Sequence, residues 1–147
     1  MKIQHLLYLF VCLSFSPVLS QSKELPKIDL EEARIFVDKF DKQFSKHFFD
    51  GDSTAIYNMY AKGATFGTLK GDDILKAWGQ SIRSSIKNDT RHFIFTSILL
   101  TTDNEYLFEV GKYEYKDSNG NSKGEGKYLM VLKKEDGEWK IYHDMGL

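Results

Sequence analysis

The sequence predicts an α+β domain in which about three helices come first and a curved antiparallel sheet follows. Between residues 29 and 86, apolar residues recur every three or four positions, which is the period of amphipathic helices. Between residues 91 and 144, they fall into short runs rich in Phe, Tyr, Ile and Thr, and turn clusters separate these runs. Helices followed by an antiparallel meander are typical of an α+β domain, and the sequence shows no internal repeat.

Asp29 and Gly51 bound the first predicted helix. Asp29 is an N-cap residue, and Glu32 follows three positions later, as in a capping box. A glycine such as Gly51 commonly ends a helix because it adopts left-handed backbone angles. One face of the helix carries a phenylalanine at every fourth position, namely Phe36, Phe40, Phe44 and Phe48. We expect this face to pack in the core.

A shorter second helix and a third helix are predicted on either side of a brief strand. Asp52 or Ser53 caps the second helix, which includes Met59 and Tyr60. Residues 64–69 form the strand, and Asp72 caps the third helix. The apolar stripe of the third helix consists of Ile74, Leu75, Trp78, Ile82 and Ile86. All three helices therefore need a common apolar surface to cover.

Four strands are predicted in the second half of the chain, and they supply that surface. They span residues 91–101, 106–115, 126–133 and 139–144. The turns between them lie at Asp103 and Asn104, at residues 117–121, and at residues 135–137. A strongly twisted sheet of this kind is concave toward the helices, and incomplete coverage of the concave face leaves a cavity.

The first twenty residues are predicted to be a secretory signal peptide. Lys2 is followed by an apolar run over residues 6–15 and by small residues before Gln21, where cleavage is expected. The run is shorter than the roughly 20 residues of a spanning helix. We therefore expect a secreted or periplasmic protein without a membrane segment after cleavage. Residues 21–27 form a leader and residues 28–147 form the domain.

Composition argues against several classes of partner and chemistry. Loss of Lys2 leaves 19 basic and 21 acidic residues, a formal charge of −2, which does not favour nucleic acid. The only cysteine is Cys12, so thiol chemistry and disulfides are not expected after cleavage. The histidines His47, His92 and His143 are scattered, unlike the ligands of a zinc site. Neither a metal nor a cofactor is predicted.

Short motifs at both ends of the domain resemble the nuclear transport factor 2-like superfamily, nearest its SnoaL-like members and members of unknown function. The motifs stand at residues 51–52, 59–61, 64–66 and 71–72, and at residues 136–144 near the end. The resemblance covers roughly residues 28–147. It implies a cone-shaped domain whose helices close a curved sheet over a mainly apolar pocket. Such a fold does not define a reaction.

The resemblance implies that the protein binds a small, largely apolar molecule. The candidate pocket residues are Tyr60, Trp78, Glu109, Tyr113 and His143. Alternation along residues 106–115 places Glu109, Gly111 and Tyr113 on one face. In the association domain of the calmodulin-dependent kinase, which has this fold, a pocket arginine matches Gly111. Glu109 and Tyr113 are therefore expected to face inward, although an exposed or ion-paired Glu109 is the structural alternative.

His143 and Asp144 are neighbours on the last predicted strand, so their side chains point to opposite faces. A regular strand places His143 on the face of Trp139 and Ile141, and Asp144 on the face of Lys140. His143 is then a candidate proton shuttle or a structural histidine. Tyr60 and Trp78 either line the pocket or pack in the core.

Two alternative functions stay open at this point. The first is a SnoaL-like isomerase, cyclase, dehydratase or hydrolase that uses Glu109 or His143 as acid or base. The sequence does not favour an enzyme, because the catalytic positions of ketosteroid isomerase match Phe44, Thr68 and Leu129, which cannot exchange the required protons. The second is a homodimeric interaction module that pairs through the outer sheet face, at Tyr106, Phe108 and Val110.

Overall fold

The computed structural model describes residues 29–103 and 105–147. The predicted signal peptide, its cleavage site, the leader, the first domain residue Ile28 and Asn104 lie outside the described residues. The elements are α1 (Leu30–Asp50), α2 (Ser53–Asn58), β1 (Tyr60–Phe66), β2 (Leu69–Lys70), α3 (Asp72–Lys87), β3 (His92–Asp103), β4 (Tyr106–Lys116), β5 (Ser122–Glu135) and β6 (Glu138–Gly146).

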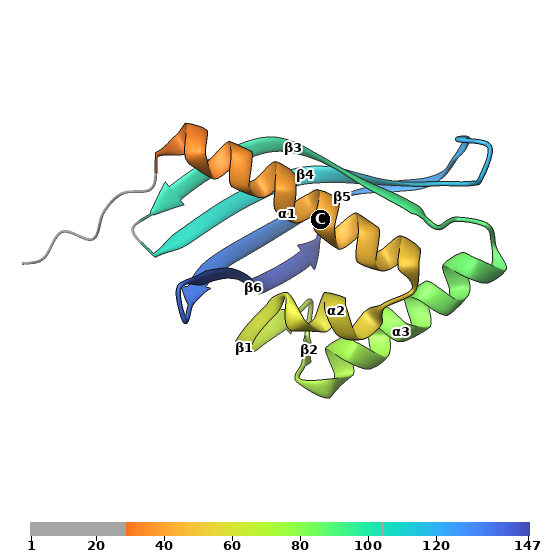
Figure 1. Ribbon diagram of the computed structural model, residues 1–147, viewed down its shortest axis with the longest axis horizontal. Coiled ribbons are helices and arrows are strands. Elements are labelled where there is room, and N and C mark those ends of the chain that lie inside the picture. Colours follow the sequence, from red (N-terminus) through yellow and green to blue (C-terminus); the bar gives the residue numbers. More distant parts are fainter. Residues whose placement is uncertain (1–28, 104) are drawn as a thin grey trace, which may run out of the picture.

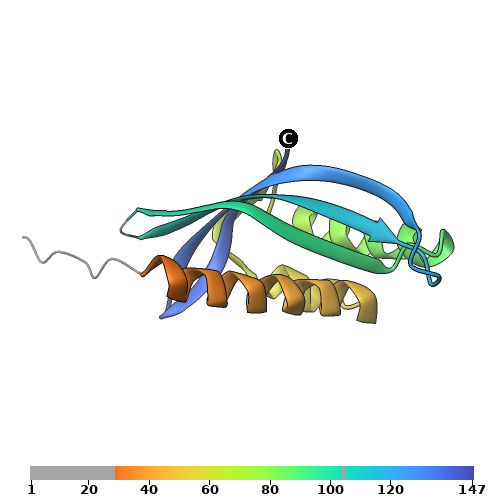
Figure 2. The same ribbon diagram turned by 90° about the horizontal axis from the view of Figure 1, so that it is seen from above.

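The six strands form one curved sheet, and the three helices pack against it. The strand order is β2-β1-β6-β5-β4-β3, so β3 is an edge strand. Neighbouring strands are antiparallel except for β1 and β6, which are parallel. Figures 1 and 2 show α1 running along the concave side of the long strands, with α3 near the far end of the sheet. The predicted α+β architecture is confirmed.

The core lies between the phenylalanine face of α1 and the inner face of the sheet. Phe44 is only 1% exposed. Its ring centroid lies 5.0 Å from that of Trp78 and 5.3 Å from that of Phe95. The sheet contributes fully buried side chains, namely Leu107, Leu132 and Ile141. The apolar spacing of the helices therefore predicts the core correctly, and aromatic rings fill most of the space.

The predicted ends of α1 are confirmed by their capping geometry. The Asp29 carboxylate accepts a hydrogen bond from the Glu31 amide at 3.2 Å, and Gly51 has a φ of +82°. The cap of α2 is Asp52, whose carboxylate accepts from the Ala55 amide at 2.8 Å. At α3 the prediction was wrong by one residue. Gly71, with a φ of +53°, holds the N-cap position, and Asp72 lies in the first turn.

Tyr60 does not belong to α2 but begins β1. The carbonyl of Met59 accepts a hydrogen bond from the Ile141 amide at 2.8 Å, so pairing with β6 ends the helix. The strand predicted at residues 64–69 is two strands, because a turn at Gly67, with a φ of +56°, separates β1 from β2. Tertiary pairing overrides the local apolar spacing at both places.

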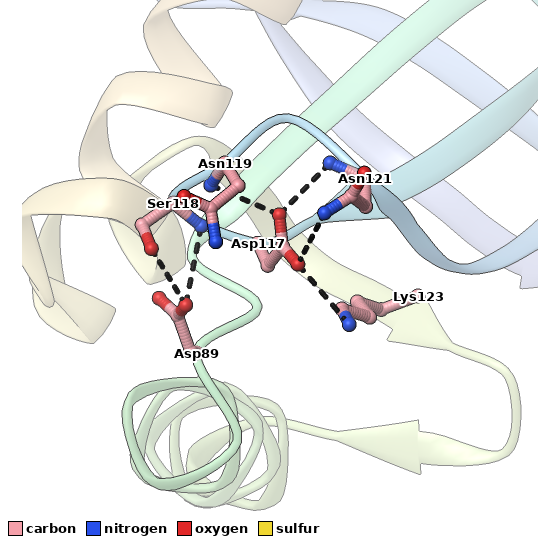
Figure 3. A network of polar contacts seen from close by, with 6 residues as sticks. All are labelled: Asp89, Asp117, Ser118, Asn119, Asn121 and Lys123. Carbon is pink, nitrogen blue, oxygen red and sulfur yellow. Dashed lines mark hydrogen bonds and ion pairs between the residues drawn. The ribbon is translucent and has the colours of Figure 1, made fainter.

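A side-chain network attaches the turn after β4 to the end of α3 (Figure 3). The Asp117 carboxylate accepts from the amides of Asn119 and Asn121 at 3.0 and 2.8 Å, and Lys123 lies 3.1 Å away. These hydrogen bonds, the Asn121 side chain first, hold the pKa of Asp117 well below its ordinary value. Beside it, Asp89 accepts from the Ser118 hydroxyl at 2.7 Å.

Replacing Asp117 with alanine should lower the melting temperature, because several donors in this turn would lose their acceptor at once. The change should be measured by thermal unfolding at pH 7. Asn119→Ala is the matched control, since only the backbone amide of Asn119 donates to Asp117. Equal melting temperatures for the two variants would contradict a structural role for the carboxylate.

Candidate functional site: a cleft between α1 and β3

A cleft of about 570 Å³ opens between α1 and the edge strand β3. Its apolar lining comes from Val37 on α1 and from five residues of β3, namely Phe93, Ile94, Phe95, Ile98 and Leu100. Polar residues complete the lining, namely Arg34, Asp38, Asp41, Lys42, Ser45, Thr96 and Ser97. Asp41 differs from the other charged residues of the cleft because it is only 8% exposed.

Glu109 on β4 is fully buried in the interior behind this cleft. It pairs with Leu100 of β3 and with Met130 of β5 in the sheet register. The Tyr128 hydroxyl donates a hydrogen bond to Glu109 Oε1 at 2.6 Å. Tyr128 takes this position by lying over Gly111, where an added Cβ would come within 2.5 Å of the ring. The glycine at this position therefore makes room for the tyrosine that binds Glu109.

Asp41 and Glu109 form a carboxyl pair that shares a hydrogen bond. Burial raises the pKa of Asp41 to about 9, and the negative charge of Glu109 and the hydrogen bond to it act in the same direction. Burial also raises the pKa of Glu109, against the hydrogen bond from Tyr128, which lowers it. Near neutral pH, Asp41 therefore keeps its proton and donates it toward the Glu109 carboxylate.

Apart from the proton that the two carboxyls share, each carboxyl also has a buried oxygen without a hydrogen-bond partner in residues 29–103 and 105–147. These atoms are Asp41 Oδ1 and Glu109 Oε2. Buried polar atoms normally have partners, so such atoms are informative. The proton between the two carboxyls is the hydrogen that the protein itself supplies to them.

Sequence reasoning missed Asp41, although a signal was present. Asp41 lies four residues after Val37 and three before Phe44, so it falls on the apolar stripe of α1. An acidic residue within an apolar helix face is costly unless it is paired or protonated. Pattern alone gives no partner, because Glu109 lies on a distant strand.

A second buried polar group joins β6, β1 and α3. Asp144 Oδ2 accepts from the Tyr60 hydroxyl at 2.7 Å, and that hydroxyl accepts from Trp78 Nε1 at 3.0 Å. Burial raises the pKa of Asp144 to about 6, while the Tyr60 hydrogen bond opposes the shift. The structure thus brings Tyr60 and Trp78 together in the interior, and neither residue lines the cleft between α1 and β3.

The predicted faces of β6 were wrong at its end. The register between β5 and β6 shifts between Val131 and Leu132, which is a β-bulge. After the bulge, Asp144 points into the interior with Ile141, and His143 points away. His143 is half-buried, and its Nδ1 lies 2.9 Å from the Thr65 hydroxyl. It does not line the cleft.

Tyr113 is half-buried on the inner side of β4, where its ring lies over Gly126 of β5. Its centroid lies 5.5 Å from that of Phe93 and 5.6 Å from that of Tyr115. Tyr113 therefore packs among aromatic rings behind the cleft. Among the predicted pocket residues, Glu109 is the one that belongs to the carboxyl pair.

No group of three or more His, Cys, Asp or Glu side chains in residues 29–103 and 105–147 is placed to hold a metal ion. Within the same residues, no helix has the length and apolar character needed to cross a membrane.

Comparisons with known proteins give structural matches only. No protein-family model matches the sequence, and no curated protein matches it. A nuclear transport factor 2-like protein of unknown function from Shewanella oneidensis superposes with a TM-score of 0.56 at 17% identity, over 78% of this chain and 98% of that chain. A domain of unknown function with a cystatin-like fold from Nostoc punctiforme superposes with a TM-score of 0.63 at 15% identity, over 77% of this chain and 75% of that chain.

A third structure, from Xanthomonas campestris, is described as a calcium/calmodulin-dependent protein kinase II association domain. It superposes with a TM-score of 0.57 at 18% identity, over 84% of this chain and 94% of that chain. Identities this low establish the fold and not the activity. Three helices on a curved, mostly antiparallel six-stranded sheet, together with these superpositions, show that the chain has the nuclear transport factor 2-like fold.

Proposed function

We propose that the protein binds a small, largely apolar molecule in the cleft between α1 and β3, with Asp41 at the polar end. The observation that carries this proposal is the buried pair of Asp41 and Glu109 beside the cleft. Small-molecule sites commonly measure about 300–1,000 Å³ and combine an apolar lining with a few convergent polar groups. The cleft has this size and this composition.

The cost of the pair supports a role in binding. Two carboxyl groups buried without a cation reduce stability, and apolar residues of similar volume would pack there without that cost. The pKa of Asp41 reflects this cost directly, since burial is the first cause of its rise. A pair that weakens the fold and borders a cleft is better explained by a ligand than by packing.

A retained ligand should be visible by native mass spectrometry of the gently purified protein. We expect a mass above that of the polypeptide, and we expect Ser97→Trp to abolish the excess by filling the cleft. Thr101→Trp on the same strand is the matched control, because Thr101 is exposed and does not line the cleft. An excess mass that persists in Ser97→Trp would place the ligand elsewhere and contradict the proposal.

The carboxyl pair also favours a second candidate, an acid–base enzyme of the SnoaL-like kind. Asp41 is a proton donor that lines the cleft, and Glu109 is the neighbouring carboxylate that would take the proton back. Carboxyl pairs whose pKa values differ are typical of acid–base catalysis. In this alternative, Glu109→Gln lowers turnover and alters its pH profile. Undiminished turnover in that variant would exclude the mechanism.

Export and self-association are further parts of this proposal. The sequence pattern of residues 1–20, which predicts a signal peptide, supports secretion or transfer to the periplasm. The outer sheet face carries the half-buried side chains Tyr106, Phe108 and Val110, which are candidates for a homodimer contact. The mass of the mature protein in solution tests the dimer.

A further inference from the structure

We infer that the molecule bound in the cleft is a short, extended peptide that pairs with the outer edge of β3 as an additional strand. This inference rests on the proposed binding function and adds the chemical class of the ligand. It starts from the lining of the cleft, which includes every residue from Phe93 to Ile98. Successive side chains of a strand point to opposite faces, so a cleft over the inner face alone would meet only every second residue. The cleft therefore also runs along the edge of β3.

The backbone of β3 offers hydrogen-bonding groups to the occupant of the cleft. β3 is the last strand of the sheet, and within residues 29–103 and 105–147 it pairs only with β4 (Figure 1). In an antiparallel pair, every second residue of an edge strand points its N–H and C=O away from the partner strand. The register with β4 is regular from His92 to Ser97 and shifts between Ser97 and Leu99. This regular stretch can pair with a peptide of about its own length.

The composition of β3 also suits it to pairing with another strand. Edge strands of natural proteins commonly carry charged residues or proline, which prevent further chains from adding to the sheet. Between His92 and Asp103, β3 has no charged residue and no proline. It exposes three large apolar side chains instead, which are Ile94 at 40%, Ile98 at 58% and Leu99 at 57%. An added strand would cover part of this apolar surface.

Hydrogen-bonding capacity distinguishes a peptide from other largely apolar molecules. A hydrocarbon chain would remove water from the outward N–H and C=O groups of the edge without bonding to them, which is unfavourable. An extended peptide offers donors and acceptors at the spacing of the strand, and its side chains alternate between two faces. One set of its side chains would enter the cleft beside Val37 and Phe95, and the other set would lie beside Ile94.

The charges at the rim of the cleft favour a peptide with an acidic residue. Lys42 is paired with Asp38 at 2.6 Å, so these two charges compensate each other. Arg34 also lines the cleft, and it makes no ion pair within residues 29–103 and 105–147. The residues of β3 that line the cleft carry no charge. A carboxylate side chain of the peptide would therefore complement Arg34.

The test screens a library of N-acetylated hexapeptide amides against the full-length protein and then modifies the backbone of the tightest binder. One derivative is N-methylated at its first, third and fifth residues, and the other at its second, fourth and sixth. Only alternate amides of an added strand face β3. We therefore expect one derivative to bind about 100-fold more weakly by isothermal titration calorimetry, and the other to bind within about threefold of the parent peptide.

Charge reversal at Arg34 tests the acidic residue of the peptide. We expect Arg34→Glu to weaken the tightest binder about fivefold, and a peptide with lysine in place of its acidic residue to regain that affinity with the variant. Arg83→Glu is the matched control, because it makes the same change at an exposed position that does not line the cleft. Equal weakening in the two variants would overturn the pairing with Arg34.

Similar affinities of the two N-methylated derivatives, or a library without a binder, would overturn the peptide inference. It would also be overturned by a dimer in analytical ultracentrifugation that Ile94→Lys dissociates and the tightest binder does not, because a second copy would then cover the edge. The proposed function is judged separately, since a non-peptide molecule retained by the purified protein and lost in Ser97→Trp would support the cleft. Absence of any retained molecule together with a library without a binder would count against both.

Discussion

Replacing Asp41 with asparagine should stabilise the protein at pH 8 and reduce the dependence of its stability on pH. Asparagine keeps the shape of the side chain, and its N–H group can donate to the Glu109 carboxylate as the protonated carboxyl does. It needs no proton from solvent to do so. The position of Asp41 would then hold a neutral donor at every pH.

The sign of the effect follows from the two pKa values. Asp41 has an ordinary value of 3.8 and a value of about 9 in the folded protein. Between these values the folded state binds the extra proton, so the free energy of unfolding falls by about 1.4 kcal/mol for each pH unit. This contribution is fully present below about pH 4 and is lost by about pH 9. The pKa of Asp144 is raised to about 6, so Asp144 also lowers the free energy of unfolding as the pH rises, over a lower pH range.

Urea unfolding of the parent and of Asp41→Asn at pH 5, 6.5 and 8 measures the effect. The difference in unfolding free energy between the two proteins should change by about 4 kcal/mol from pH 5 to pH 8, in favour of the variant at high pH. Asp50→Asn should leave the parent's pH dependence in place, because its carboxylate is exposed and paired with Lys46. Parallel curves for the parent and Asp41→Asn would show that Asp41 is ionised normally.

Gly111→Ala should destabilise the protein and displace Tyr128 from Glu109. The new Cβ would lie 2.5 Å from the Tyr128 ring, which is shorter than the distance between non-bonded carbon atoms in proteins, so the ring must move. Overpacking of this kind costs about 1–3 kcal/mol. The lost hydrogen bond to Glu109 adds to that cost, because the buried carboxylate would lose one of its donors.

Gly124→Ala is the matched control for this prediction. It also lies in a long strand, and its added Cβ would meet only Tyr115 Cδ2 at 4.0 Å, an ordinary contact. The free energies of unfolding of the two variants, measured by chemical denaturation, should differ by at least the cost of overpacking. The pKa of Glu109 should also rise in Gly111→Ala, since the Tyr128 hydrogen bond lowers it in the parent. Similar stabilities for both alanine variants would contradict the close contact over Gly111.

The same contact depends on the register between β4 and β5. Gly111 pairs with Tyr128 across β4 and β5, and the tyrosine ring occupies the space above the glycine. Alternation along the strand predicts that Glu109 and Gly111 share one face, and the structure places Glu109 in the interior. It gives no information on Tyr128, because the partner residue depends on the register between two strands.

The sequence by itself determined the elements whose signals are local. The phenylalanine spacing of α1, its caps at Asp29 and Gly51, and the turns between the last strands predict an α+β domain with its core against α1. Amphipathic period and capping depend on neighbours within a few positions, so they can be read along the chain.

Only the tertiary structure decided the chemistry of the interior. The partner of Asp41 lies on β4. Tyr60 belongs to β1 and not to α2. A bulge in β6 places Asp144 in the interior, where a regular strand would place His143. Each of these features depends on strand register and on packing between distant segments. A shift of one residue in register exchanges the two faces of a strand, and no local pattern in the sequence records that shift.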